Sequence, residues 1–267
     1  MRRVLVLLAL ALAVPAAASA QARRPVVDVF ALPEFREATK EATAEELFEA
    51  AAVMHVRLRQ YRQAIPLLEA LVKDITDRSD LWMLLAIAYN RIDEPREAWD
   101  AANIAIALAP DTTLYYGERG VAAVMDGRDA DGVRDLSRFL AAYRANARGH
   151  LYRGIARARL GEHDAAREDL DRASALNPRL ALVADYYVGL VAARTGRTLE
   201  AQILLRETLE AFEGVETPFK ETVRAQLKAL EAAEAPQRAA AARRLREALV
   251  TLDAEHSLKH LPRPSAP

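Results

Sequence analysis

The chain has 267 residues, a formal net charge of −1, a hydrophobic fraction of 52% and no cysteine. The near-neutral charge argues against a bulk binder of nucleic acid or of anionic membranes. The lack of cysteine excludes disulfides, thiol catalysis, zinc–thiolate sites and a lipid attached to an N-terminal cysteine.

Residues 1–20 have the features of a secretory signal peptide. Arg2 and Arg3 give a positive start, the stretch 4–14 is apolar, and residues 18–20 (Ala-Ser-Ala) form a small-residue cleavage site. The apolar stretch is too short for a spanning helix, and an uncleaved anchor is the alternative interpretation. We therefore expect a mature chain that starts at Gln21, has no transmembrane segment, and lies in the periplasm or outside the cell.

Residues 21–43 are expected to lead into the folded part of the chain. Pro25 and Pro33 flank a mostly apolar stretch, which predicts extended chain followed by a short helix. Thr43 and Glu46 have the spacing of a capping box, which marks the start of the first long helix.

Small residues then recur with a fixed period. Such a period indicates one structural unit repeated five times. A small residue lets two helices cross closely, so the unit is predicted to be a helix pair. Two series, twelve positions apart, advance in equal steps of thirty-four positions, with one position more in the last step: Ala52, Ala86, Gly120, Gly154 and Gly189, and Ala64, Ala98, Gly132, Ala166 and Ala201.

The units are placed at 45–78, 79–112, 113–146, 147–181 and 182–215. Gly127, Gly161 and Gly196 each lie seven residues after a small residue of the first series, where a left-handed residue can end a helix. The extra residue of the last, longer step is expected in the link 177–181.

The pattern resembles the tetratricopeptide repeat family over residues 45–215. The third and fifth units depart from it, with Arg144 and Glu213 where proline is usual and Thr208 in place of a small alanine. The matching residues in the first, second and fourth units are Phe48, Ala52, Tyr61 and Ala64; Trp82, Ala86, Tyr89, Ala98, Ala105 and Pro110; and Gly154, Gly161, Ala166, Ala173 and Pro178.

This resemblance implies an all-α fold, a right-handed α-solenoid (superhelix) of about five tetratricopeptide-like helix pairs. It also implies a concave groove lined by the first helix of each unit, and binding rather than catalysis. Residues 216–258 are predicted to be C-terminal capping helices, because the end of a stacked array needs a polar outer face. Residues 259–267, which contain three prolines, are predicted to be a disordered tail.

The spacing also predicts which residues line the groove. The positions one residue after the small residue of each first helix should face it, and so should the positions four residues before those. These positions are largely apolar, which argues against the family's clamp for a terminal carboxylate. The groove residues are Val53, Met83, Ile87, Val121, Leu151, Ile155, Tyr186 and Leu190, with Glu49 and Gly117 completing the set.

Four arginines recur at the end of the first helices: Arg57, Arg91, Arg159 and Arg194. They can bind acidic side chains of a partner at the groove edge, or they can interact with the negative end of the helix dipole. The expected occupant of the groove is another envelope protein or peptide with apolar anchors and acidic residues. Internal filling by the stretch 26–32 or by the helix starting at Pro236 is the alternative.

Other candidate sites have weaker patterns. Residues 129–132 (Asp-Ala-Asp-Gly) resemble the start of a calcium loop, but the glycine comes too early and no closing glutamate follows. His256 and His260 supply only two ligands, which do not make a metal site. No serine-hydrolase elbow, P-loop, dinucleotide glycine pattern or zinc-protease motif occurs. We expect no metal, no cofactor and no nucleic-acid partner.

The sequence therefore predicts a non-enzymatic, exported scaffold or adaptor for protein–protein interaction in the bacterial cell envelope. Two alternatives remain at this stage. One is a hydrolase that acts on envelope or exported substrates through an unrecognised site. The other is a structural subunit of a secretion or pilus assembly.

Overall fold

The computed structural model describes residues 26–40, 42–211, 213, 220–233, 236, 240 and 243–244. The predicted signal peptide, the predicted tail and most of the predicted second capping helix lie outside this set. The chain divides into two compact units, residues 1–184 and 185–267, which are described separately below. Among the described residues, no helix is both long enough and apolar enough to cross a membrane.

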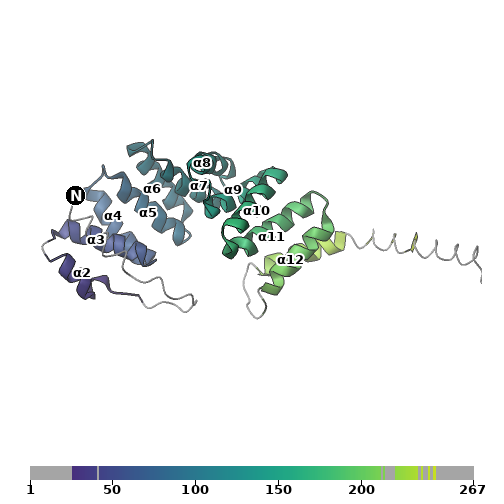
Figure 1. The fold of residues 1–267 in the computed structure, drawn as a ribbon, viewed down its shortest axis with the longest axis horizontal. Coiled ribbons are helices and arrows are strands. Elements are labelled where there is room, and N and C mark those ends of the chain that lie inside the picture. The colour runs from purple at the N-terminus through teal and green to yellow at the C-terminus, as the bar shows by residue number, and fades with distance from the viewer. Residues whose placement is uncertain are drawn as a thin grey trace, which may run out of the picture. The chain divides into compact units, whose positions relative to one another are not determined.

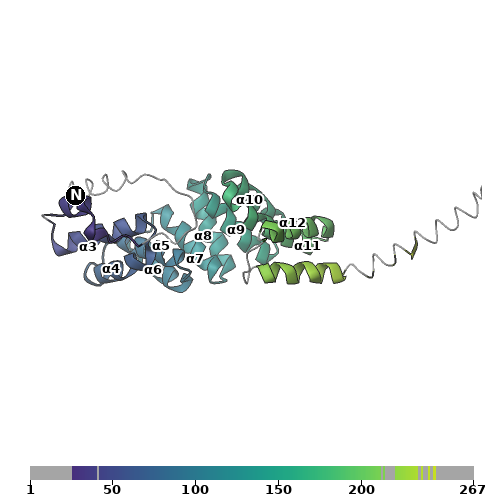
Figure 2. The same ribbon diagram turned by 90° about the horizontal axis from the view of Figure 1, so that it is seen from below.

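The first unit contains four consecutive helical hairpins, visible in chain order in Figures 1 and 2. Each helix packs against the next one in sequence, within a hairpin and between hairpins. The prediction of an all-α solenoid is therefore confirmed. The hairpins are α3 (Ala44–Arg57) with α4 (Tyr61–Asp74), α5 (Ser79–Arg91) with α6 (Pro95–Leu108), α7 (Thr113–Met125) with α8 (Asp129–Ala142), and α9 (Ala147–Leu160) with α10 (His163–Leu176).

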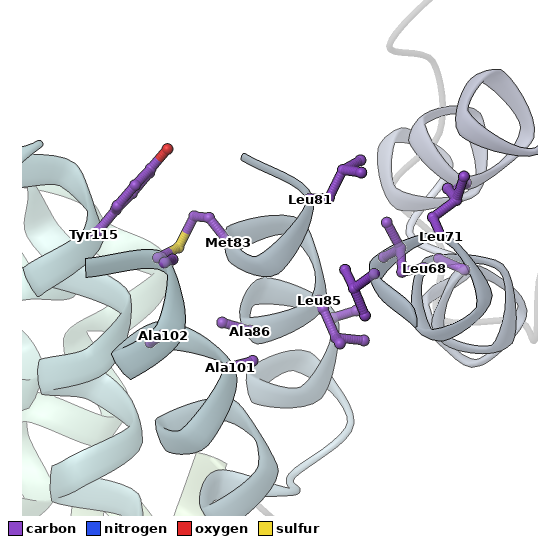
Figure 3. Close-up of a cluster of buried hydrophobic side chains, with 14 of the residues drawn as sticks. Leu68, Leu71, Leu81, Met83, Leu85, Ala86, Ala101, Ala102 and Tyr115 are labelled. Atoms are coloured by element: carbon purple, nitrogen blue, oxygen red, sulfur yellow. The ribbon is translucent and has the colours of Figure 1, made fainter. Parts of the chain in front are cut away.

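The small residues lie where the two helices of a hairpin meet. A Cβ atom added to Gly120 would come within 2.8 Å of the Leu136 Cγ, and one added to Gly132 within 2.4 Å of the Val124 Cγ2. Ala86 on α5 is fully buried and points toward α6, where Ala102 is also fully buried (Figure 3). Larger side chains here would separate the helices, because protein interiors are already close-packed.

Larger apolar side chains fill the space between hairpins. One buried cluster contains Leu68 of α4, three side chains of α5 and Tyr115 of α7 (Figure 3). The α5 side chains are Leu81, Met83 and Leu85. The cluster spans three successive hairpins, so stacking buries surface that a single hairpin would expose to water.

One residue in each turn adopts the left-handed conformation. Gly127 and Gly161 do so, as the sequence predicts, with φ of 80° and 85°. Arg59 and Asp93 occupy the equivalent places in the first two hairpins, with φ of 59° and 68°. The turn geometry thus recurs in each of these hairpins even where the sequence has no glycine.

The lead-in forms a 3-10 helix, η2 (Val29–Ala31), followed by the short helix α2 (Pro33–Ala38). Val29 and Phe35 are buried against Ala51 of α3, and Leu67 of α4 packs against the same cluster. The segment proposed above as an internal occupant of the groove therefore packs on the first hairpin. The capping box is present, with Thr43 and Glu46 each accepting from the backbone N–H of the other.

The link after α10 holds a second 3-10 helix, η3 (Pro178–Leu180), at the place where the sequence predicts one extra residue. Helix α11 (Ala181–Arg194) follows, and the first unit ends within it, at Ala184.

The second unit contains the rest of α11, α12 (Thr198–Ala211) and a helix over residues 220–233. Tyr186, Leu205, Val223 and Leu227 form its buried cluster. Val223 is fully buried and lies one repeat length after Gly189, so it continues the first series of small positions with a larger side chain. The helix 220–233 thus covers the α11–α12 hairpin as a further first helix would.

Candidate partner-binding surface

The first helices of the four hairpins form a continuous line in the first unit. Helix α3 contacts α5, α5 contacts α7, and α7 contacts α9, although a second helix separates each pair in sequence. We call the faces along which these four helices meet the first-helix row. Side chains on this row come from different hairpins, so a bound segment that follows it would contact several repeats at once.

Most of the predicted groove residues pack inside the fold. Met83, Val121, Leu151 and Ile155 are between 3% and 6% exposed, and Tyr186 is 5% exposed within the second unit. Gly117 is buried too, and the other four groove residues, Glu49, Val53, Ile87 and Leu190, are half-buried. Of the apolar groove residues in the first unit, Val53 and Ile87 are therefore the ones that a partner could contact.

One accessible apolar side chain on the row is missing from the prediction. Leu114 is 45% exposed. It lies four residues before Glu118 and seven before Val121, so these three residues share one face of α7. The equivalent positions in the other units are Glu46, Asp80, Arg148 and Val183, and Val183 is 38% exposed. The repeat period shows that these positions are equivalent, but it does not show which of them are accessible.

The arginines at the helix ends have partners within the fold. Arg91 lies 3.4 Å from both carboxylate oxygens of Glu118 on α7. Arg159 donates to the backbone oxygen of Val124 at 2.9 Å and to Asp129 at 3.2 Å. Each therefore ties its hairpin to a neighbour, a role that neither of the two interpretations from sequence included. Arg194 is exposed at the end of α11, in the second unit.

Glu118 is the centre of a polar cluster on the row. Asn90 donates through Nδ2 to the backbone oxygen of Glu118 at 2.9 Å and to the Glu118 carboxylate at 3.0 Å. Arg148 donates through Nη1 to both carboxylate oxygens, at 2.9 and 3.0 Å. Burial raises the pKa of Glu118, but the charges of Arg148 and Arg91 outweigh it and hold the pKa below its usual range. The side chain is therefore a carboxylate at neutral pH.

A second set of charges is repeated in the third and fourth hairpins. Arg119 forms two hydrogen bonds with Asp135, at 2.6 and 2.9 Å, and a third with Asn103 of α6. Arg153 likewise bonds Asp169 twice, at 2.8 and 2.7 Å. Both aspartates are 3% exposed. These pairs join the first helix of a hairpin to its second helix, which is a structural role.

The calcium-like stretch forms the first turn of α8. Asp131 pairs with Arg134, and Asp129 accepts from Arg159. Among the described residues, no group of three or more histidine, aspartate or glutamate side chains could hold a metal ion. His256 and His260 lie outside that set.

The fold resembles that of MamA, an all-helical repeat protein of the tetratricopeptide type. One MamA structure, from AMB-1, has a TM-score of 0.54 at 23% identity over 63% of this chain and 99% of its own. Another, from MSR-1, has a TM-score of 0.54 at 20% identity over 63% and 97%. MamA of Desulfovibrio magneticus RS-1 has a TM-score of 0.53 at 15% identity over 65% and 97%.

At these identities the likeness concerns the fold alone, and the chain has a tetratricopeptide-type fold. No family model matches the chain. A search of curated proteins finds no relative.

Proposed function

We propose that this chain is an exported, non-enzymatic scaffold of the bacterial cell envelope that binds a peptide or helix of another envelope protein along the first-helix row. The observation that carries the proposal is the row itself. Four first helices from four hairpins meet along one line, and Leu114 leaves an apolar side chain accessible at its middle. An extended or helical segment can place several anchors on such a surface.

The chemistry of the row indicates the kind of partner. Ile87 and Leu114 offer apolar contact, and Arg91 and Arg148 offer guanidinium groups on side chains that remain 31% and 28% exposed. A partner with apolar anchors and acidic side chains complements both. The signal peptide predicted from the sequence of residues 1–20 supports the envelope as the place where the two proteins meet.

The test uses two matched substitutions. Leu114→Asp places a charge on the row, and Leu108→Asp places one on α6, where the leucine is similarly exposed at 42%. Both variants should fold, because both side chains are accessible. Affinity capture from envelope extracts should recover about tenfold less partner with Leu114→Asp and an unchanged amount with Leu108→Asp.

Equal recovery by both variants would contradict the proposal that the row is the binding surface. Circular dichroism of each variant verifies that a lost interaction does not reflect a lost fold.

A further inference from the structure

Two arginines share a single carboxylate at the middle of the first-helix row. Arg91 reaches Glu118 from α5 and Arg148 reaches it from α9. The three side chains carry two positive charges against one negative charge. A guanidinium has five N–H donors. The hydrogen bonds to Glu118 use the Nη1 and Nη2 nitrogens of Arg91 and the Nη1 nitrogen of Arg148. The pair of arginines therefore retains charge and donors for a second carboxylate.

Asn90 provides an independent sign that this cluster is incompletely satisfied. It is more than nine-tenths buried, since the residue is only 5% exposed. The amide nitrogen donates twice to Glu118, which fixes the orientation of the group. The amide oxygen is buried and has no hydrogen-bond partner among the described residues. A buried acceptor without a donor costs free energy, and a donor from a bound molecule would remove that cost.

We propose that an acidic side chain of the partner binds between Arg91 and Arg148, and that Glu118 is the internal carboxylate it displaces. This inference rests on the proposed function, and it names the partner chemistry and the residue that sets the selectivity. When the Glu118 side chain turns aside, the oxygen of Asn90 becomes available to a backbone N–H of the partner. Leu114, four residues before Glu118 on the same face of α7, supplies apolar contact beside the charge.

Glu118 makes the site selective in two ways. A neutral side chain cannot replace the carboxylate without leaving two guanidinium groups unpaired, and a basic side chain would add a third positive charge. The bond to Glu118 also lowers the affinity for a single acidic residue, since each partner must first break an internal ion pair. The cluster thus favours a segment that combines an acidic side chain with an adjacent apolar anchor.

The experiment compares two fluorescein-labelled amphipathic peptides by fluorescence polarisation. One carries leucine along one face and glutamate along the other, and its twin has glutamine in place of every glutamate. The mature chain is compared with Glu118→Gln, which removes the competing charge and keeps the shape. Glu162→Gln is the matched control, because Glu162 also pairs with an arginine, Arg157 at 3.5 Å, but lies in the turn before α10 and is not one of the predicted groove residues.

We expect Glu118→Gln to bind the glutamate peptide about tenfold more tightly than the unmodified chain, and the glutamine twin with unchanged affinity. Glu162→Gln should change neither affinity. Arg148→Gln is a second variant that does not depend on the first one folding, and it should bind the glutamate peptide about tenfold more weakly.

Equal affinity of all the variants for both peptides would overturn the inference and leave apolar binding on the row in place. Binding of neither peptide by any variant would contradict both the inference and the proposed function.

Discussion

At the scale of single residues, backbone conformation sets the turns between helices. Arg59 follows α3 with φ of 59°, a conformation that places Cβ too close to the following carbonyl oxygen in any residue except glycine. Asp93 has the same geometry after α5, with φ of 68°. Aspartate tolerates this region better than arginine, because its short side chain can bond the nearby backbone. The backbone of Arg59 is therefore more strained than that of Asp93.

Replacing Arg59 by glycine should stabilise the first unit by about 1 kcal/mol, since it removes the Cβ from a left-handed residue. The arginine is exposed, so little packing is lost. Asp93→Gly should give a smaller gain. Urea denaturation of both variants measures the free energy of unfolding. A loss of stability in Arg59→Gly would show that the side chain contributes more than its backbone conformation costs.

The glycines show which residue-level features could be predicted from sequence. Gly154 and Gly161 both follow the period, and the structure gives them different tasks. A Cβ on Gly154 would lie 2.9 Å from the Leu170 Cγ, whereas one on Gly161 would meet nothing within 4 Å. Gly161 is needed for its φ of 85° alone. The period located both positions, and the placement of a glycine in a helix or in a turn told the two tasks apart.

At the scale of helices, buried charges hold the fourth hairpin together. Asp169 on α10 accepts hydrogen bonds from His150, Arg153 and Arg157, all on α9. Burial raises the pKa of Asp169, but the hydrogen bonds from Arg153 and His150 and the arginine charges outweigh it, so the pKa lies below its ordinary range. This arrangement was invisible in the sequence, because charged residues on helices are usually solvated.

Asp169→Asn should destabilise the first unit by about 3 kcal/mol at neutral pH, because it removes the buried carboxylate and leaves the partly buried guanidinium groups of Arg153 and Arg157 without a counter-charge. The control is Asp171→Asn on the same helix, where an exposed pair with Arg167 at 3.5 Å contributes no more than about 0.5 kcal/mol. Thermal or urea unfolding compares the two. Similar losses in both variants would contradict the structural role of Asp169.

The lowered pKa of Asp169 also predicts the direction of pH dependence. Its contribution is complete above the pKa of an unfolded aspartate, about 3.9, and is lost as pH falls through the lower folded value. The unmodified chain should therefore lose stability more steeply than Asp169→Asn as acid is added below pH ~4. Parallel pH profiles would count against this assignment.

At the scale of the whole molecule, the repeat explains both what the sequence predicts and what it misses. The repeat period can locate helices, turns and the apolar positions of the groove, because each unit packs against its neighbours in the same way. It cannot tell an accessible position from one that the next hairpin covers. Val121 and Leu151 are covered, while Leu114 is exposed. The Glu118 cluster also escapes the period, because it joins side chains from three different hairpins.

The most direct test of the central claim is a crosslinking scan that follows the repeat. A photoreactive residue replaces Asp80 or Leu114 near the starts of α5 and α7, or Ile104 or Arg138 on α6 and α8. The two members of each set occupy equivalent repeat positions and are exposed. We expect the first set to capture one common envelope protein and the second set not to capture it. Capture of that protein mainly from the second helices would show that the first-helix row is not the binding surface.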